Sequence, residues 1–312
     1  MKWLVTGGAG YIGSHVVQTL LHEGEEVIAF DSLLSGKAER LLDSCEIVVG
    51  DIRDEELVTQ TIEKNRIEGI INLAALKSVE ESRSKPQEYH DINHIAMGRI
   101  LDIAIKFGVG IFIQSSTAAV YGDSLDGYVD EEVAAKPISP YGATKLAAEN
   151  ALNKAISGGK ILGCSLRYFN VLGSQSAVLK DASTANIVPM VLSAISKNES
   201  PKIFGDDYLT PDGTCIRDYV HVEDIANAHV LAATNLKVKQ TSVAINIGTG
   251  SGYSVREIIS EILIQMGSSL QPVVTNRRQG DPAILVAKVD LAIKELGFKA
   301  QKTLEEMITS SI

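Results

Sequence analysis

Tyr141 and Lys145 are the two residues whose types and spacing best suit proton transfer. They stand four residues apart, directly after Pro140, and a helix that begins at Pro140 would bring phenol and ammonium onto one face. A free tyrosine is a poor base at neutral pH, but a cation about 4 Å away contributes roughly 4 kcal/mol at an effective dielectric of about 20, which lowers the pKa of the phenol toward neutrality. Tyr141 can then exchange a proton with a sugar hydroxyl. An ordinary surface pair is the alternative.

Thr117 is the third candidate catalytic residue. It ends the run Ser115-Ser116-Thr117 at the carboxyl end of an expected strand, where open α/β sheets bind ligands. Its hydroxyl can hydrogen-bond the oxygen whose proton Tyr141 handles. A helix cap or a turn is the alternative role for Thr117.

A glycine-rich turn predicts a dinucleotide site. The expected strand 3–6 opens into GGAGYIG at 7–13, a spacing that allows a tight turn, a close approach to a pyrophosphate and close packing of helix on strand. Asp31 ends the next expected strand, 18 residues after Gly13, near the offset at which an acidic residue bonds the adenosine ribose. Because a carboxylate there repels the extra phosphate of NADP, NAD is the predicted cofactor. Asp51, at another strand end, is a candidate either for the adenine edge or for a turn cap.

Short apolar runs alternate with helical patterns and predict the elements that position these residues. The expected strands are 3–6, 27–30, 47–49, 69–73, 111–115 and 161–167, and a later helix and strand are expected at 222–233 and 243–248. This alternation favours an α/β fold with a Rossmann-type doubly wound parallel sheet and a smaller, mixed α/β C-terminal substrate lobe. The predicted domains are 1–170 plus about 222–248 for NAD, and about 171–221 plus 249–312 for the substrate.

Charge and composition limit the class of protein. The net charge of −10 disfavours nucleic acid and anionic membrane surfaces as partners. Three widely spaced cysteines suit a reducing compartment, no stretch is apolar and long enough to cross a bilayer, and no metal site is indicated. We therefore expect a cytoplasmic protein. Apolar residues beyond one face of the expected helices 87–107 and 141–155, among them Ile95, Met97, Ile100, Leu101 and 103–105, predict a homodimer through these helices.

Several long motifs together resemble the extended short-chain dehydrogenase/reductases, and among them the epimerases of nucleotide sugars. They are TGGAGYIGSH at 6–15, GDIRD at 50–54, NLAALKSVEES at 72–82, SSTAAVYGD at 115–123, SPYGATK at 139–145, RYFNVLG at 167–173, DGTCIRDYVHVEDIA at 212–226 and RRQGDPA at 277–283. The resemblance covers nearly the whole chain. It implies NAD-dependent epimerisation at C4 of a UDP-hexose, through a transient 4-keto sugar and without net redox change.

The same resemblance implies roles for individual residues. Tyr141 would take the C4 hydroxyl proton, Thr117 would orient the C4 oxygen, and Lys145 would lower the Tyr141 pKa and bond the nicotinamide ribose. The implied cofactor-binding residues are Gly7, Gly10, Tyr11, Ile12, Gly13, Asp31, Asp51, Ile52, Leu73, Ala74, Lys77, Asn93, Ser115, Tyr141, Lys145 and Tyr168. The implied substrate-binding residues are Thr117, Tyr141, Asn170, Asn186, Phe204, Arg217, Tyr219, Arg278 and Asp281, with Arg217 and Arg278 on the diphosphate.

Other functions remain open at this point. A nucleotide-sugar dehydratase of the same fold needs an acidic pair after the Ser/Thr, and Ala118 and Ala119 stand there instead, which disfavours dehydration. An epimerase or decarboxylase acting on UDP-glucuronate, a UDP-N-acetylhexosamine or a UDP-pentose is a closer alternative. A non-catalytic NAD-binding protein is a further one, although it would have no reason to keep Tyr141, Lys145 and Thr117 together.

Overall fold

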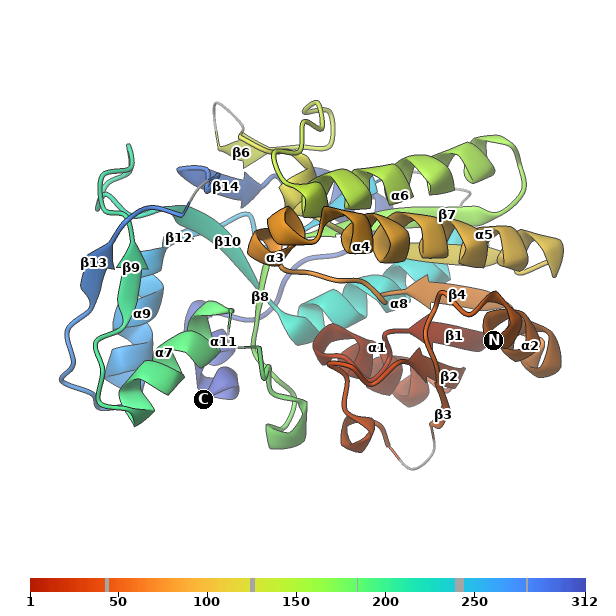
Figure 1. The fold of residues 1–312 in the computed structure, drawn as a ribbon, viewed down its shortest axis with the longest axis horizontal. Coiled ribbons are helices and arrows are strands. Elements are labelled where there is room, and N and C mark those ends of the chain that lie inside the picture. The colour runs from red at the N-terminus through yellow and green to blue at the C-terminus, as the bar shows by residue number, and fades with distance from the viewer. Residues whose placement is uncertain (43–44, 124–126, 184, 239–243, 279) are drawn as a thin grey trace.

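A seven-stranded sheet, parallel throughout, forms the first lobe of the protein (Figure 1). The computed structural model describes residues 1–42, 45–123, 127–183, 185–238, 244–278 and 280–312. The sheet order is β11-β7-β5-β4-β1-β2-β3. Its strands are β1 (Lys2–Thr6), β2 (Glu26–Asp31), β3 (Glu46–Val49), β4 (Gly69–Asn72), β5 (Ile111–Thr117), β7 (Leu162–Tyr168) and β11 (Ala244–Ile247). The predicted Rossmann-type sheet is confirmed, and residue 243 of the last expected strand lies outside the described residues.

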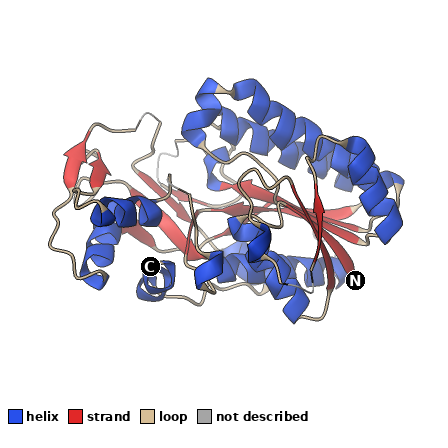
Figure 2. Cartoon of the chain, turned by 60° about the horizontal axis from the view of Figure 1, so that its bottom comes forward, coloured by secondary structure: helices blue, strands red, loops and turns tan. Residues whose placement is uncertain are grey.

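Helices cover both faces of this sheet, as Figure 2 shows. On one face α1 and α8 pack against each other, and on the other α5 packs against α2 and α6. The helical elements of this lobe are α1 (Tyr11–His22), η1 (Ala38–Arg40), α2 (Glu55–Asn65), α3 (Val79–Ser84), α4 (Pro86–His90), η2 (Asp91–Ala96), α5 (Met97–Lys106), η3 (Ala118–Val120), α6 (Pro140–Ser157), α8 (Val222–Val238) and α10 (Asp290–Leu296). Because both faces are covered, the strands are apolar almost throughout, and each face has its own apolar core.

The strand order reverses at β1, which lies between β2 and β4. In open α/β sheets such a reversal leaves a crevice beyond the carboxyl ends of the strands, where ligands bind. Here the loop after β1 carries Gly7 and the loop after β4 carries Leu73 and Ala74. The two loops meet, because a Cβ on Gly7 would lie 2.7 Å from the Ala74 nitrogen.

A second lobe is built from smaller sheets and a separate core. β10 pairs with β8, β12 and β14, β14 also pairs with β6, and β13 pairs with β9. The elements are β6 (Tyr128–Val129), β8 (Asn170–Leu172), η4 (Ala177–Leu179), α7 (Ile187–Ser196), β9 (Lys202–Phe204), β10 (Ile216–His221), β12 (Gly252–Ser254), α9 (Val255–Gln265), β13 (Val273–Thr275), β14 (Ile284–Ala287) and α11 (Leu304–Ser311). β6 belongs to this lobe by pairing although it precedes residue 170 in the chain.

The loop after β8 joins the two lobes. The hydroxyl of Tyr11, in the first turn of α1, donates to the carbonyl of Gly173 at 2.6 Å, and the backbone N–H of Gln175 donates to His15 Nε2 at 3.2 Å. From the other side, the N–H of Gly173 donates to the hydroxyl of Ser311 in α11 at 2.7 Å. This loop is therefore fixed both to the glycine-rich turn and to the second lobe.

The region 87–107 is helical as expected from its sequence, with a π-helical turn inside the run. It consists of α4, a π-helical turn η2 and α5. Met97, Ile100, Leu101 and Ala104 are buried in the core beneath α5. Most of the apolar residues that suggested a dimer therefore pack against the sheet. Ile95, Ile103 and Ile105 are only partly buried.

Among the residues that the structure describes, none of the helices combines the length and apolar character needed to cross a membrane. All three cysteines are free and buried.

Candidate active site

The start of α6 brings Tyr141 to the end of β5. Pro140 is in the first turn, and the Ser139 side chain caps the helix by accepting from the Gly142 N–H at 3.1 Å, so the helix begins where the sequence predicts. Gly142 lies against the chain after β5, because a Cβ there would be 2.5 Å from the Ala119 carbonyl oxygen. Only glycine allows this close approach of α6 to the chain after β5. The phenol of Tyr141 lies beside Thr117, whose side chain hydrogen-bonds the phenol.

Thr117 has the helix-cap role that the sequence offered as an alternative. As the last residue of β5, it also caps the short helix η3 by accepting from the Ala119 N–H at 3.2 Å. This cap fixes the rotamer of the side chain that contacts Tyr141. The helix cap and the contact with the phenol are therefore compatible.

Lys145 is buried one turn along α6, and its ammonium donates to the carbonyl of Ser115 at 2.9 Å. Burial lowers the pKa of Lys145 to about 8, and the carboxylate of Glu149 acts in the opposite direction. Burial raises the pKa of Tyr141 to about 12, against the hydrogen bond with Thr117. The sequence predicted a lowered pKa for Tyr141, and in the chain by itself this was wrong. Loss of solvation outweighs a lysine whose ammonium is directed to a strand carbonyl.

The glycine-rich turn fits the pyrophosphate of a dinucleotide. Gly7 has φ of +70°, and a Cβ on Gly13 would lie 2.0 Å from the Gly7 carbonyl oxygen, so side chains at these positions would close the cradle. The first helical hydrogen bond of α1 runs from the Ser14 N–H to Gly10. The N–H groups of Tyr11, Ile12 and Gly13 thus precede the hydrogen-bonded turns and are available to an anion.

Asp31 ends β2 beside this turn, as predicted. Its carboxylate accepts from the N–H groups of Ala9 at 3.0 Å and Leu33 at 2.8 Å. A carboxylate has about four acceptor sites, so these bonds fix its orientation and leave capacity for ribose hydroxyls. The position of Asp31 fits the adenosine half of NAD.

Other predicted cofactor residues have structural partners of their own. Asp51 accepts from the backbone and the guanidinium of Arg53, which lowers the pKa of the Asp51 carboxyl. Asp51 thus has the turn-capping role that the sequence left open, while its neighbour Ile52 is buried in the core. The Tyr168 hydroxyl bonds His229 Nε2 at 2.6 Å on the α8 side of the sheet, so that hydroxyl already has a partner.

Asn93 fixes the loop after β4. Its amide bonds the N–H and the carbonyl of Leu76 at 2.8 and 2.9 Å, and its Nδ2 donates to the Thr144 hydroxyl at 3.2 Å. The π-helical turn η2 places the side chain there, and such turns are frequent at functional sites. Lys77, in the same loop, is exposed.

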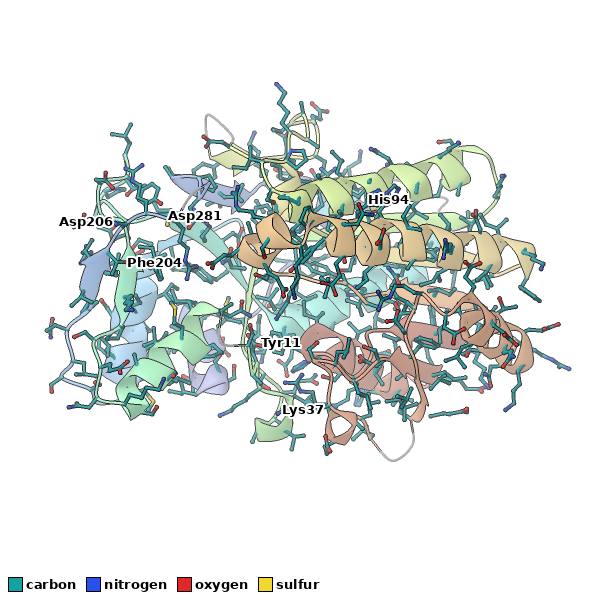
Figure 3. All side chains as sticks on the ribbon, viewed as in Figure 1. Tyr11, Lys37, His94, Phe204, Asp206 and Asp281 are labelled. Atoms are coloured by element: carbon teal, nitrogen blue, oxygen red, sulfur yellow. The ribbon has the colours of Figure 1, made fainter. Side chains whose placement is uncertain are left out.

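The predicted substrate residues other than Thr117 and Tyr141 lie in the second lobe. Figure 3 shows Phe204 and Asp281 there, to the left of Tyr11. The guanidinium of Arg278 stacks on Phe204 with 4.0 Å to the ring centre. Arg217 lies 3.8 Å from a carboxylate oxygen of Asp281.

The remaining substrate residues differ in exposure. Tyr219 pairs with Asn170 across β10 and β8, but the Tyr219 side chain is buried in the core of the second lobe while Asn170 is exposed. Asn186 is the residue before α7, and its amide bonds Asp181. The contacts thus link Arg278 with Phe204 and Asp281, and Asp281 with Arg217.

Sequence reasoning missed a buried ion pair beneath α6. Arg167 on β7 donates to both carboxylate oxygens of Glu149 at 2.9 and 2.7 Å. Glu149 follows Lys145 by four residues, as Lys145 follows Tyr141. That repeated spacing could have indicated that Glu149 lies on the same helical face as Tyr141 and Lys145.

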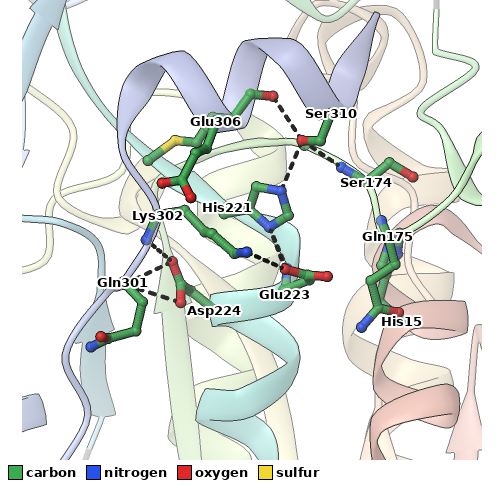
Figure 4. Close-up of polar contacts among 12 residues, drawn as sticks. His15, Ser174, Gln175, His221, Glu223, Asp224, Gln301, Lys302, Glu306 and Ser310 are labelled. Carbon is green, nitrogen blue, oxygen red and sulfur yellow. Dashed lines mark hydrogen bonds and ion pairs between the residues drawn. The ribbon is translucent and has the colours of Figure 1, made fainter.

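Two cavities lie away from Tyr141. One, of about 470 Å³, is bordered by β10, α8 and α11 and contains the polar cluster in Figure 4, where His221 bonds the Ser310 hydroxyl at 2.9 Å and Lys302 pairs with Glu223 at 3.2 Å. The other, of about 290 Å³, lies between α7 and β9 and reaches Phe204. His221 and Glu223 are already bonded within the protein, so the first cavity adds no reactive group to the site.

Comparisons with known proteins agree with this geometry. Residues 3–248 match the model of the NAD dependent epimerase/dehydratase family. A UDP-glucose 4-epimerase of Halalkalibacterium halodurans is 40% identical, over 99% of this chain and 93% of the relative. A UDP-glucose-4-epimerase of Stenotrophomonas maltophila, solved with bound NAD and formylated UDP-arabinopyranose, is 35% identical with a TM-score of 0.95, over 100% of this chain and 96% of that one. The UDP-glucose 4-epimerase of Bifidobacterium longum in complex with NAD⁺ and UDP is 35% identical with a TM-score of 0.92, over 100% and 97%.

Proposed function

The chain belongs to the NAD dependent epimerase/dehydratase family, and from this membership we propose that it interconverts UDP-galactose and UDP-glucose by epimerisation at C4. The observation that carries the proposal is the convergence of Tyr141, Thr117 and Lys145 at the carboxyl end of β5, in a chain that resembles UDP-glucose 4-epimerases over its full length. NAD is the cofactor that the family and the glycine-rich turn imply.

The residues of the chain handle the proton and hold the sugar. Tyr141 Oη accepts the proton of the C4 hydroxyl as the 4-keto sugar forms and returns it when the hydroxyl is restored. The Thr117 hydroxyl orients the C4 oxygen, and the Lys145 ammonium favours the phenolate. When bound, NAD⁺ supplies the acceptor and later the donor of the C4 hydride, together with a positive charge that also favours the phenolate.

The two lobes divide the binding. The first lobe, which is residues 1–170 and about 222–248 with β6 excepted and α10 added, binds NAD through Gly7, Gly10 and Gly13, with Asp31 on the ribose. The second lobe, which is about 171–221 and 249–312 with α10 excepted and β6 added, binds the UDP-sugar, with Arg217 and Arg278 on the diphosphate and Asp281 on the uridine ribose. Guanidinium groups suit this task because their planar donors match phosphate oxygens.

Epimerisation is favoured over the dehydration that the family also includes. Elimination of water across C5 and C6 needs one group to remove the C5 proton and one to protonate the leaving C6 hydroxyl. The positions after Thr117 are Ala118 and Ala119, which form the start of η3 and cannot transfer protons. The 4-keto sugar therefore has no carboxylate from this turn to remove a proton from C5.

A homodimer in the cytoplasm is the assembly and location that we propose. Ile95, Ile103 and Ile105 remain partly exposed along η2 and α5, and a second copy could cover them. Light scattering at micromolar concentration should give twice the mass of the chain. A monomer at that concentration would exclude this assembly.

The test of the function is turnover of a substrate panel. The purified chain is incubated separately with UDP-galactose, UDP-glucuronate, UDP-N-acetylglucosamine and a UDP-pentose, and NMR of the anomeric protons identifies each product. We expect UDP-glucose from UDP-galactose as the fastest reaction. Faster turnover of another sugar would reassign the substrate. No turnover of any of them would favour a non-catalytic NAD-binding protein.

A further inference from the structure

Glu149 completes a stripe on α6 that begins with Tyr141 and Lys145. The three residues are four apart, so they follow one another along one face of the helix. Lys145 and Glu149 are both buried. Lys145 bonds the Ser115 carbonyl at 2.9 Å, and Glu149 accepts from the Ser116 hydroxyl. The helix thus holds the two residues of β5 that immediately precede Thr117.

A row of polar side chains on neighbouring strands of the sheet includes the hydrogen-bond donors of Glu149. Ser116, Arg167 and Asn246 are register partners on β5, β7 and β11. Arg167 bonds Glu149 with two nitrogens and donates its third to the Tyr121 hydroxyl at 2.9 Å, which in turn donates to Asn246 at 2.6 Å. With Ser116 and Arg167 as donors, the carboxylate receives three hydrogen bonds. These hydrogen bonds fix the orientation of the buried carboxylate.

The charges around Lys145 come from several elements. On α6 these are Tyr141 and Glu149, and Glu149 bonds Arg167 on β7, which bonds Tyr121 before α6. Glu131 acts on the pKa of Tyr121, and the next residue of β7, Tyr168, bonds His229 on α8. Burial lowers the pKa of His229 to about 4 and raises those of Tyr121 and Glu131. Glu149 is the group that acts to raise the pKa of Lys145.

We propose that Glu149 is a positioning residue of the reaction: its carboxylate keeps the buried Lys145 ammonium charged and, through Ser116, fixes the strand end that carries Thr117. The inference rests on the proposed function for the roles of Tyr141, Lys145 and Thr117. Arg167 has the complementary task. It pairs with the Glu149 carboxylate through two nitrogens, which offsets the cost of burying that group.

The direct test measures Lys145 in the chain without cofactor. Lysines are labelled with ¹³C at the ε carbon, and the signal missing from a Lys145→Arg sample identifies Lys145. Burial lowers the pKa of Lys145 to about 8, so we expect its signal in the parent chain to titrate near that pH. In Glu149→Gln the midpoint should fall by about one pH unit, whereas Glu63→Gln, an exposed change on α2, should leave it in place. An unchanged midpoint in Glu149→Gln would overturn the proposal.

A second variant separates charge from folding. Glu149→Gln leaves Arg167 buried without its partner, so the single variant is expected to melt at a lower temperature. The double variant Glu149→Gln with Arg167→Met removes both charges and should regain part of that melting temperature, while the Lys145 midpoint stays below that of the parent. A midpoint that returns to the parent value would show that the pair only supports the fold, and the proposal would fail.

The pH profile of turnover gives an independent readout. Lys145 loses its charge as the pH rises through its pKa, so the alkaline decline in rate should move to lower pH in both variants, giving roughly a tenfold loss near pH 8.5. An alkaline decline at the parent position would contradict the proposal. If the parent chain turned over no UDP-sugar while the NMR midpoint still fell in Glu149→Gln, the proposed function would fail and the electrostatic role of Glu149 would remain.

Discussion

Arg167 and Arg277 each pair with a carboxylate, but in opposite surroundings. Beneath α6, the side chains of Arg167 and Glu149 are 8% and 1% exposed, and every nitrogen of the guanidinium has a partner. In the second lobe, Arg277 and Asp207 are 44% and 73% exposed. Water screens the second pair and not the first. The end of the molecule where we propose the reaction thus has a desolvated ion pair, and the end where we propose nucleotide binding has a solvated one.

Tyr141→Phe should give the largest effect. Without the phenolic oxygen no group accepts the C4 proton, and we expect kcat for UDP-galactose to fall about a thousandfold, within the range of general acid–base catalysis. Tyr128→Phe, at an exposed tyrosine of β6, is the control and should leave kcat unchanged. A Tyr141→Phe protein as fast as the parent would remove Tyr141 from the mechanism.

Arg167→Leu should be next. It leaves the Glu149 carboxylate buried without its guanidinium, and we expect the free energy of unfolding to fall by about 3 kcal/mol. Urea unfolding followed by circular dichroism measures this loss. A protein as stable as the parent would mean that the buried pair contributes no more to the free energy of unfolding than a surface pair. The two ion pairs would then not differ in energy.

Arg278→Ala tests the nucleotide end. It removes a guanidinium that stacks on Phe204 and that we place on the diphosphate, so KM for UDP-galactose should rise about tenfold while kcat changes little. Steady-state kinetics measures kcat and KM separately. The inhibition constant of UDP, as a competitive inhibitor, should rise together with KM. A fall in kcat with constant KM would move Arg278 from substrate binding to the chemical step.

Asp207→Asn should have the smallest effect. The ion pair that it breaks is exposed, so the urea midpoint should match that of the parent. KM should change only at low ionic strength, where screening is weak. A clear loss of stability at physiological salt would show that the pair of Asp207 and Arg277 stabilises the fold. The two ion pairs would then differ less in their contribution to stability.

The sequence predicted the regular parts of the molecule well. The apolar runs at 3–6, 27–30 and 111–115 correspond to β1, β2 and β5, because strands buried on both faces must be apolar whatever their neighbours are. Pro140 marked the start of α6. Both signals are local, so they can be read without the fold.

Features that depend on distant partners could not be read this way. The pairing of Glu149 with Arg167 needs β7 to lie beneath α6, and the turn at η2 depends on Asn93 reaching Leu76 and Thr144. The Tyr141 pKa was misjudged because a four-residue spacing shows proximity to Lys145 but not the burial of both groups. Loss of solvation is a property of the tertiary structure.

The bond from Tyr11 to Gly173 ties the first turn of α1 to a loop that Ser311 holds from the far side. Neither lobe can unfold without losing contacts with the other. Both lobes should therefore unfold together on heating. A calorimeter would then record a single endothermic peak for the chain, and Tyr11→Phe, which lacks the tethering oxygen, should broaden or split that peak.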